Sequence, residues 1–133
     1  MNQSSEENLA TITLLYEALA ARDVATIQTL FAEDVVIFQT PRLPWGGEHR
    51  GHEGLFTFFL TLVDHIESQV EIEDLFTAGD HVVQRGRTRG TVTATGAAFD
   101  ISEVHVFELR DGKIVRYNPY IDTPAMLAAL ELP

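Results

Sequence analysis

Apolar side chains in the first half of the chain recur every three to four positions, which is the spacing of one face of an α-helix. The pattern predicts a first helix over residues 4–23 and a later, longer-faced helix over residues 52–66. Ser4 and Glu7 have the spacing of a capping box, which places the start of the first helix. Asp23 has the position of an N-cap, so a short second helix is expected directly after it.

Strand-like runs occupy most of the second half of the chain and one place in the first. Runs rich in β-branched and aromatic residues, separated by turn signals, predict strands over residues 34–40, 68–78, 80–94, 97–109 and 113–122. Thr123 and Pro124 suit the cap and the first turn of a short C-terminal helix.

This order of elements predicts a single α+β domain over residues 1–133. Helices that precede an antiparallel meander cover one face of its sheet. Because a long sheet twists and curls, we expect a cone-shaped curved antiparallel sheet wrapped around the N-terminal helices. Its interior would be concave, mostly apolar and open at one end, which suits a small-molecule ligand.

Composition narrows the classes of partner. The 133 residues are 45% hydrophobic and 22% charged, as in ordinary globular proteins. A formal net charge of −11 argues against nucleic acids and anionic membranes, which bind clusters of Lys and Arg. The absence of cysteine excludes disulfides and thiolate chemistry. No apolar run has the length of a membrane helix and the first residues are polar, so we expect a soluble, cytoplasmic protein.

Glu103 and His105 are the first candidates for chemistry. On their predicted strand they share a face with three apolar residues, Phe99, Ile101 and Phe107. An acid and an imidazole inside an apolar pocket are typical of sites where pKa values move towards neutrality. In the alternative interpretation this face turns to solvent or to a partner subunit, and Val104 and Val106 lie in the core.

Asp122 has two interpretations. Simple alternation along the last predicted strand sends the side chain of Asp122 away from the apolar row that contains Tyr117 and Ile121. Pro119 cannot donate to the sheet ladder, and a bulge there would reverse the alternation and turn Asp122 towards the pocket. Asp122 would equally serve as an N-cap ahead of the C-terminal helix. The sequence is compatible with both catalysis and capping.

The loop PRLPWGGEHRGHEG, residues 41–54, carries two histidines and four glycines. His49-x-x-His52 lacks a third ligand at a zinc-like spacing, so we expect no metal site. The glycines match neither a dinucleotide fingerprint nor a P-loop, so we expect neither phosphate binding nor a cofactor. In the predicted fold this loop passes the open end of the cone, and Trp45 would lean over the opening as part of a rim or lid.

Arg85, Arg87 and Arg89 alternate along one face of a predicted strand. They fit a solvated stripe that pairs with the many acidic side chains. A second interpretation is a carboxylate-binding set at the mouth of the pocket.

Four segments together resemble the nuclear transport factor 2-like superfamily. They are LYEALAARD, LFAEDVVI, the loop pattern G-x-x-x-G-HEG-x-x-x-FF over residues 47–59 and FELRDGKIVRYNPYIDTPAMLAAL, and the resemblance covers residues 6–131. The chain is most similar to the SnoaL-like polyketide cyclase and ketosteroid-isomerase-related branch. The resemblance implies a cone-shaped α+β fold and a homodimer formed through the outer face of the sheet. The superfamily contains isomerases, cyclases, epoxide hydrolases, dehydratases and non-catalytic binders, so the resemblance implies the fold more narrowly than the function.

The resemblance also implies roles for individual residues. Ketosteroid isomerases have a general-base aspartate near the end of the first strand, where this chain has Gln39, which cannot accept a proton. Their first-helix tyrosine falls on Leu15, one residue away from Tyr16. Their protonated carboxyl group falls on Glu103.

SnoaL-like cyclases use an aspartate and a histidine of the late strands, which resemble Asp122 and His105. We therefore expect a small-molecule enzyme that transfers protons next to a carbonyl, in an isomerisation or an aldol-type cyclisation. His105 and Asp122 would act as acid and base, while Glu103 or Tyr16 would polarise the oxygen. The side chains expected to contact the apolar ligand are Tyr16, Phe38, Gln39, Trp45, Phe59, Phe99, Phe107 and Tyr117.

Two other functions fit the same scaffold. Gln39 in place of a base favours a non-catalytic module that binds a small ligand or dimerises. Hydrolysis of an epoxide by a water held between a carboxylate and an arginine is the third, and it needs an inward-facing arginine such as Arg87.

Overall fold

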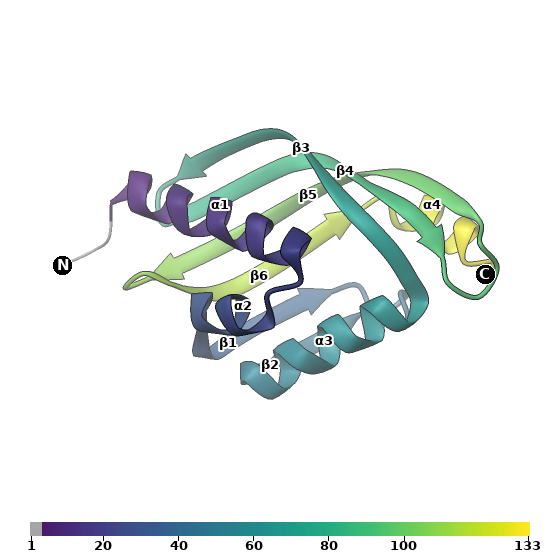
Figure 1. Cartoon of the computed structure of the whole chain (residues 1–133), viewed down its shortest axis with the longest axis horizontal. Helices are drawn as coiled ribbons and strands as arrows, with labels where there is room; N and C mark the ends of the chain where they lie inside the picture. Colours follow the sequence, from purple (N-terminus) through teal and green to yellow (C-terminus); the bar gives the residue numbers. More distant parts are fainter. Residues whose placement is uncertain (1–3) are drawn as a thin grey trace.

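The structure, a computed structural model, describes residues 4–133, in which three helices lie against one face of a curved sheet (Figure 1). A fourth, short helix lies at one end of the sheet. The helices are α1 (Ser5–Ala21), α2 (Val24–Leu30), α3 (Gly51–His65) and α4 (Thr123–Ala129). The strands are β1 (Phe31–Gln39), β2 (Gly47–Arg50), β3 (Ile66–Ala78), β4 (His81–Val92), β5 (Ala98–Arg110) and β6 (Lys113–Ile121). The predicted α+β class is confirmed.

Side-chain caps start the first two helices where the sequence predicts. The Ser4 hydroxyl accepts a hydrogen bond from the Glu7 backbone N–H at 3.1 Å, and the Glu7 carboxylate accepts one from the Ser4 backbone N–H, so the capping box is present. The Asp23 carboxylate accepts from the Thr26 backbone N–H at 3.2 Å and begins α2. Arg22, between the two helices, has a left-handed backbone with φ 56°, which ends α1.

The loop expected over residues 41–54 contains a short strand. β2 pairs antiparallel with the end of β1 at one edge of the sheet. Its sequence, Gly-Glu-His-Arg, has no β-branched or aromatic residue, so hydrophobic periodicity gives no sign of a strand. The edge of β1 offers unpaired backbone groups, and pairing with them makes this segment extended.

The strands are ordered β2-β1-β6-β5-β4-β3. The predicted meander of β3 to β6 is antiparallel throughout, but β1 and β6 are parallel. The expected antiparallel meander is present, and the one parallel pair among the described strands joins β1 to its last strand. The three hairpin turns of the meander bring β6 beside β1 in the same direction, which alternation within single strands does not reveal.

Alternation gives the sheet two different faces. The inner face packs against α1 and α3 and carries buried apolar side chains such as Ile37 and Phe107. Outer-face side chains that remain exposed include Phe38, Val104 and Tyr120. The homodimer implied by the resemblance would use this outer face, and it stays a prediction.

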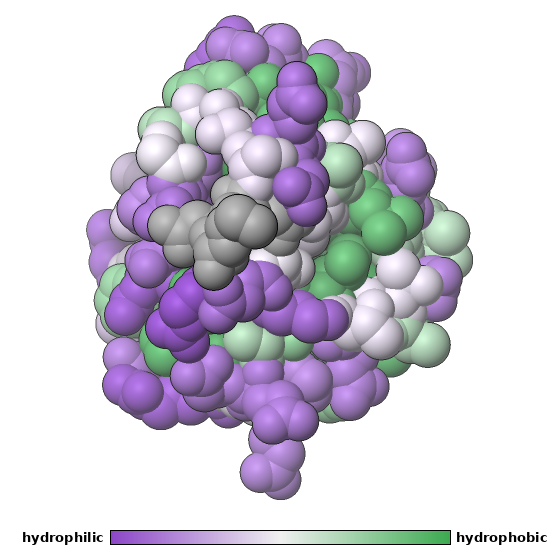
Figure 2. Space-filling model, turned by 90° about the vertical axis from the view of Figure 1, so that its left-hand side faces the viewer, coloured by the Kyte–Doolittle hydropathy of each residue, from purple (hydrophilic) through white to green (hydrophobic). Residues whose placement is uncertain are grey.

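The molecular surface near the N-terminus is mainly hydrophilic, with a smaller apolar area at one edge of that view (Figure 2). Such a surface is in keeping with a chain of net charge −11. Across residues 4–133, none of the helices combines the length and apolarity needed to cross a bilayer.

Candidate active site

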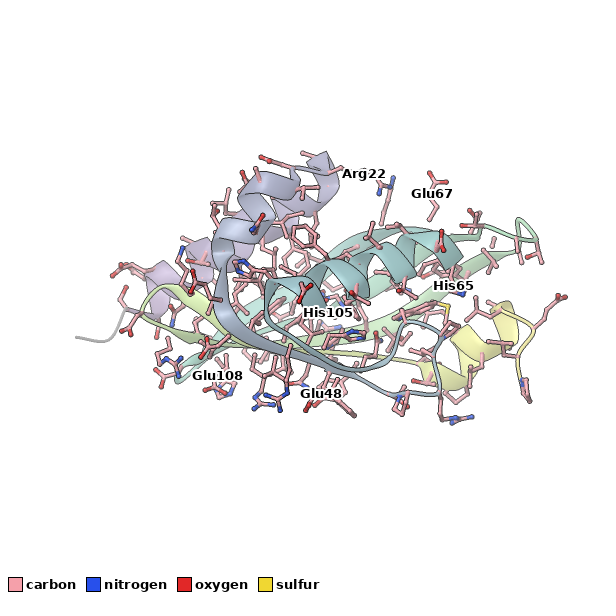
Figure 3. The ribbon with its side chains drawn as sticks, turned by 90° about the horizontal axis from the view of Figure 1, so that it is seen from below. Arg22, Glu48, His65, Glu67, His105 and Glu108 are labelled. Atoms are coloured by element: carbon pink, nitrogen blue, oxygen red, sulfur yellow. The ribbon has the colours of Figure 1, made fainter. Side chains whose placement is uncertain are left out.

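A cavity of about 560 Å³ lies between the inner face of the sheet and the helices α1 and α3. Its lining includes Glu103 and His105, so their face of β5 is the pocket face, as the first interpretation predicts. In Figure 3, His105 lies near the middle of the molecule, between the sheet and the helices. Five of the eight side chains expected to contact a ligand also line the cavity: Tyr16, Gln39, Trp45, Phe59 and Tyr117.

The strand register places the polar side chains of the cavity wall beside one another. His105 in β5 is opposite Gln84 in β4 and Pro119 in β6. Glu103 is opposite Gly86, two positions along β4 from Gln84. Residues two positions apart in a strand share a face, so Gln84, Glu103 and His105 all point inward.

Four side chains close a ring of polar contacts at this wall, with Tyr16 supplied by α1. The Tyr16 hydroxyl is 2.8 Å from His105 Nδ1, and His105 Nε2 is 3.3 Å from Glu103 Oε1. Gln84 Nε2 donates to Glu103 Oε2 at 2.6 Å and to the Tyr16 oxygen at 3.3 Å. The side chains of Glu103 and His105 are only 1% and 8% exposed, so bulk water does not compete for these bonds.

The chemistry of the four groups assigns the protons of the ring. A carboxylate beside His105 Nε2 favours a proton on that nitrogen, which leaves Nδ1 as the acceptor for the Tyr16 hydroxyl. The two N–H groups of Gln84 point at Glu103 and at the Tyr16 oxygen. The reverse orientation of the Gln84 amide would set its oxygen against the carboxylate. In this arrangement the Gln84 amide and the Tyr16 hydroxyl each donate to an acceptor, and His105 Nε2 lies 3.3 Å from Glu103 Oε1.

Gln84 makes these bonds although its own carbonyl oxygen is left unpaired. The residue is fully buried, and within residues 4–133 its Oε1 has no hydrogen-bond partner. Oε1 lies over Gly86, where a Cβ atom would collide with it and with the carbonyl oxygen of Glu71. An unpaired buried carbonyl is unfavourable. The charge-assisted bond to Glu103 is of the stronger kind and offsets that loss.

Both tyrosines of the cavity are held in the protonated form. Burial raises the pKa of the Tyr16 phenol far above its usual range; the Gln84 hydrogen bond opposes this shift and the Glu103 charge adds to it. Burial likewise raises the pKa of Tyr117, and the neighbouring Tyr16 and Glu103 add to the shift. At neutral pH both hydroxyls therefore remain hydrogen-bond donors.

Two donors of the lining are available to a ligand. Among residues 4–133 the Tyr117 hydroxyl and the Gln39 Nε2 group donate no hydrogen bond, and both residues line the cavity. The other end of the Gln39 amide is fixed, because its Oε1 accepts a 2.9 Å hydrogen bond from Trp45 Nε1. A carbonyl oxygen entering the cavity can thus be met by an O–H and an N–H group.

Asp122 lies outside the cavity. It is exposed, and its carboxylate accepts the Ala125 backbone N–H at 3.2 Å as the N-cap of α4. The irregularity in the β5–β6 pairing falls between Glu108 and Leu109, away from Pro119. Simple alternation therefore continues to the end of β6 and turns Asp122 outward. The structure supports capping, and the expectation of an acid–base role in the pocket is corrected.

Three of the expected aromatic contacts are also corrected. Phe38 is 42% exposed on the outer face, because its neighbours Ile37 and Gln39 both point inward. Phe99 and Phe107 do point inward, but they belong to the core rather than to the cavity lining. Phe107 stacks on Tyr117 with ring centroids 4.7 Å apart, so it supports a lining residue from behind.

Trp45 lines the cavity as a fixed wall. It is only 2% exposed and its indole N–H is bonded to Gln39. A mobile lid needs a side chain that can leave its contacts, so the rim or lid hypothesis does not fit this position. Contact between Trp45 and a ligand stays a prediction.

The arginine stripe lies on the outer face and pairs with acids. Arg87 and Arg89 both bond Asp100, and Arg85 bonds Glu73. The solvated-stripe interpretation is confirmed. Arg87 points away from the cavity, so it is not the inward-facing arginine that epoxide hydrolysis would need.

The two loop histidines serve the backbone. His49 Nε2 faces the carbonyl oxygens of Trp45 and Gly46, each at 3.2 Å, and His52 Nε2 faces that of Phe31 at 2.9 Å. Within the described part of the chain, no three His, Asp or Glu side chains gather as metal ligands.

Gln84 is the site residue that the sequence reasoning missed. The alternating arginines on either side of Gln84 could have indicated its position. If Arg85 and Arg87 face solvent, alternation sends Gln84 to the other face, into the core. A glutamine at a core position needs partners, and the inward acid and imidazole of the next strand are the partners it has.

A family profile described as the SnoaL-like domain matches residues 12–117. Among solved structures, a nuclear transport factor 2-like protein of unknown function from Burkholderia pseudomallei has a TM-score of 0.87. Its sequence is 26% identical, and the match covers 93% of this chain and 97% of that one. No curated protein matches the sequence.

Two further structures share the fold at lower identity. TerC, crystallised with polyporic acid, is 24% identical with a TM-score of 0.86 over 94% of this chain and 98% of that one. A protein assigned as a SnoaL-like polyketide cyclase from a Jannaschia species is 20% identical with a TM-score of 0.83 over 100% and 99% of the two chains. At these identities the likeness shows the fold alone.

Proposed function

The chain belongs to the SnoaL-like domain family, and on this premise we propose that it is an enzyme that moves protons on an apolar carbonyl compound held in the cavity. The observation that carries the proposal is the closed ring of Tyr16, Gln84, Glu103 and His105 in the cavity wall. A buried imidazole between a carboxylate and a phenol is suited to accepting and returning a proton.

The cavity suits a ligand with an apolar body and a polar oxygen. Its volume of about 560 Å³ is in the range of small-molecule sites, and aromatic side chains such as Trp45 and Phe59 form part of its wall. The hydroxyl of Tyr117 and the amide of Gln39 would bind the carbonyl oxygen. Similar folds crystallised with polyporic acid or assigned as polyketide cyclases support a small-molecule occupant.

Proton removal would run through Tyr16 to His105. The Tyr16 oxygen accepts the proton from the carbon next to the carbonyl as the phenol passes its own proton to His105 Nδ1. The raised pKa of Tyr16 disfavours a free phenolate, so the two transfers occur together. Glu103, 3.3 Å from Nε2, balances the imidazolium that results.

The ligand is left as an enolate, whose oxygen is stabilised by the Tyr117 and Gln39 donors. Return of the same proton from His105 through Tyr16 to a different carbon completes an isomerisation. Attack of the enolate carbon on a second carbonyl of the same ligand, with the proton delivered to the new alkoxide, completes an aldol-type cyclisation. Both outcomes restore the ring to its starting arrangement.

A non-catalytic carrier is the second candidate. Gln39, at the end of β1, cannot act as a base, because an amide accepts no proton at neutral pH, and its amide oxygen is occupied by Trp45. The cavity would then bind its ligand without chemical change.

Hydrogen exchange in heavy water tests the proposal without knowledge of the natural product. A panel of cyclic aryl ketones is incubated with the protein in D2O. Fluorescence of Trp45, the chain's one tryptophan, reports which ketones enter the cavity. Proton NMR then follows loss of the signal from the carbon next to the carbonyl. We expect at least one bound ketone to exchange about 10²-fold or more faster than in buffer.

Two results would contradict the proposal. If every ketone that shifts the Trp45 fluorescence exchanges at the buffer rate, the result points to the carrier. A panel in which no ketone alters the fluorescence contradicts an apolar carbonyl ligand.

A further inference from the structure

The cavity continues outward into a second hollow. The outer hollow has a volume of about 290 Å³ and shares Arg22, Leu62, Val63, Ile66 and Ser68 with the lining of the main cavity. The shared residues come from the end of α1, the end of α3 and the start of β3. A ligand with one end at the Tyr16–His105 wall can therefore extend towards this outer hollow.

Arg22 occupies a backbone position that does not favour an arginine. Its φ of 56° and ψ of 38° lie in the left-handed region, and its N–H caps the carbonyls of Ala18 and Leu19. Helices commonly end with glycine in this conformation, because a Cβ atom is strained there. Here the position instead carries a long cationic side chain that lines both hollows.

The guanidinium of Arg22 has room for a ligand. Arg22 is exposed, and among residues 4–133 its guanidinium forms neither an ion pair nor a side-chain hydrogen bond, whereas Arg85, Arg87 and Arg89 of the outer face are each paired with an acid. Arg22 is also the one permanently cationic side chain of the main cavity lining described here. Figure 3 shows Arg22 and Glu67 on the same side of the molecule, and both line the outer hollow without meeting in an ion pair.

We propose that Arg22 binds a carboxylate at the outer end of the ligand, so that the preferred ligand is a keto acid with an apolar ring body. Its ketone would lie at the Tyr16–His105 wall and its carboxylate at the guanidinium, which can hold both oxygens at once. The chain as a whole repels anions at its net charge of −11. Arg22 at the mouth of the cavity would offset this repulsion locally, for a ligand whose carboxylate reaches the guanidinium while its apolar body fills the cavity. The orientation of the ligand rests on the proposed function, but the carboxylate contact does not.

Binding of matched ligands to matched variants tests this. Tetralone and a tetralone carboxylic acid, together with larger pairs of the same kind, are titrated against Trp45 fluorescence. The variants are Arg22→Gly and Arg22→Gln, with Arg42→Gln as the control, since Arg42 is exposed and lines neither hollow. We expect both Arg22 variants to bind the acid about tenfold more weakly and the neutral ketone unchanged. Glu67→Gln should strengthen binding of the acid.

Thermal unfolding separates a ligand contact from a structural role. Arg22→Gly should raise the melting temperature, because glycine tolerates the left-handed backbone, while it weakens binding of the acid. The proposal is overturned if the Arg22 variants bind every acid as tightly as wild type does, or if they lose affinity for the acid and the ketone equally. It is also overturned if wild type binds each keto acid no more tightly than the matching neutral ketone. Hydrogen exchange of the neutral ketone in D2O is measured separately with wild type. If the proposed function is wrong, the ketone binds but exchanges at the buffer rate, and the result for the carboxylate contact is unaffected.

Discussion

Replacing His105 by glutamine is expected to slow the exchange of a cavity-bound ketone by about 10²–10⁴-fold, the range in which positioned acids and bases act. Glutamine keeps a polar side chain of similar reach but takes up no proton at neutral pH. Tyr16→Phe should cause a loss of the same order, because it removes the hydroxyl that lies 2.8 Å from Nδ1 while keeping the ring packed against Phe107. Exchange is measured by proton NMR in D2O with saturating ketone.

The slower exchange reflects a lost proton transfer only if both variants still bind the ketone. Trp45 fluorescence should give nearly the same affinity for wild type and both variants, since neither substitution removes the Tyr117 or Gln39 donors. His81→Gln is the matched control, because His81 is a half-exposed histidine at the start of β4 and does not line the cavity. A His105→Gln protein that keeps more than about a tenth of the wild-type exchange rate would show that His105 is not the base.

Replacing Gln84 by leucine is expected to destabilise the fold by about 2–4 kcal/mol. The substitution removes the 2.6 Å hydrogen bond to Glu103 Oε2 and leaves a carboxylate that is 1% exposed with His105 as its one partner. The loss of stability in Gln84→Leu should depend on the presence of the Glu103 carboxylate. In the double variant Gln84→Leu/Glu103→Leu, no carboxylate remains to be stranded, so the double variant should be more stable than Gln84→Leu alone. Urea unfolding monitored by circular dichroism measures all of these changes.

Asn8 supplies the control for this cycle. It is another buried amide whose carbonyl oxygen has no partner among residues 4–133, and it takes no part in the ring. Asn8→Leu combined with Glu103→Leu should be additive within about 0.5 kcal/mol, as expected for sites that share no partner. If the changes in unfolding free energy of Gln84→Leu and Glu103→Leu are also additive in the double variant, Gln84 does not hold the Glu103 carboxylate.

Local signals were enough to predict most of the fold. The capping box at Ser4 and the N-cap at Asp23 begin helices because they satisfy backbone N–H groups that nothing else reaches. The meander was visible because its strands carry β-branched residues between turn signals. β2 and the parallel pairing of β1 with β6 were not visible, since both depend on which edge of the sheet a distant segment meets.

The sequence predicted only the site residues that lie on one face of a single strand. Glu103 and His105 share a face two positions apart, and that face proved to be the pocket face. Phe38 could not lie in the pocket once Gln39 did, which strict alternation already required. Tyr16 meets His105 through the packing of α1 on the sheet, and the sequence has no local pattern that encodes such a contact.

We infer that His105 is held as a base whose unprotonated nitrogen, Nδ1, faces the Tyr16 hydroxyl. Nitrogen-15 NMR of the ligand-free protein, recorded across a series of pH values, reads the protonation of each ring nitrogen of the neutral imidazole directly. We expect a proton on Nε2, beside Glu103, and none on Nδ1. A proton on Nδ1 would contradict it, because the imidazole could then accept nothing from Tyr16.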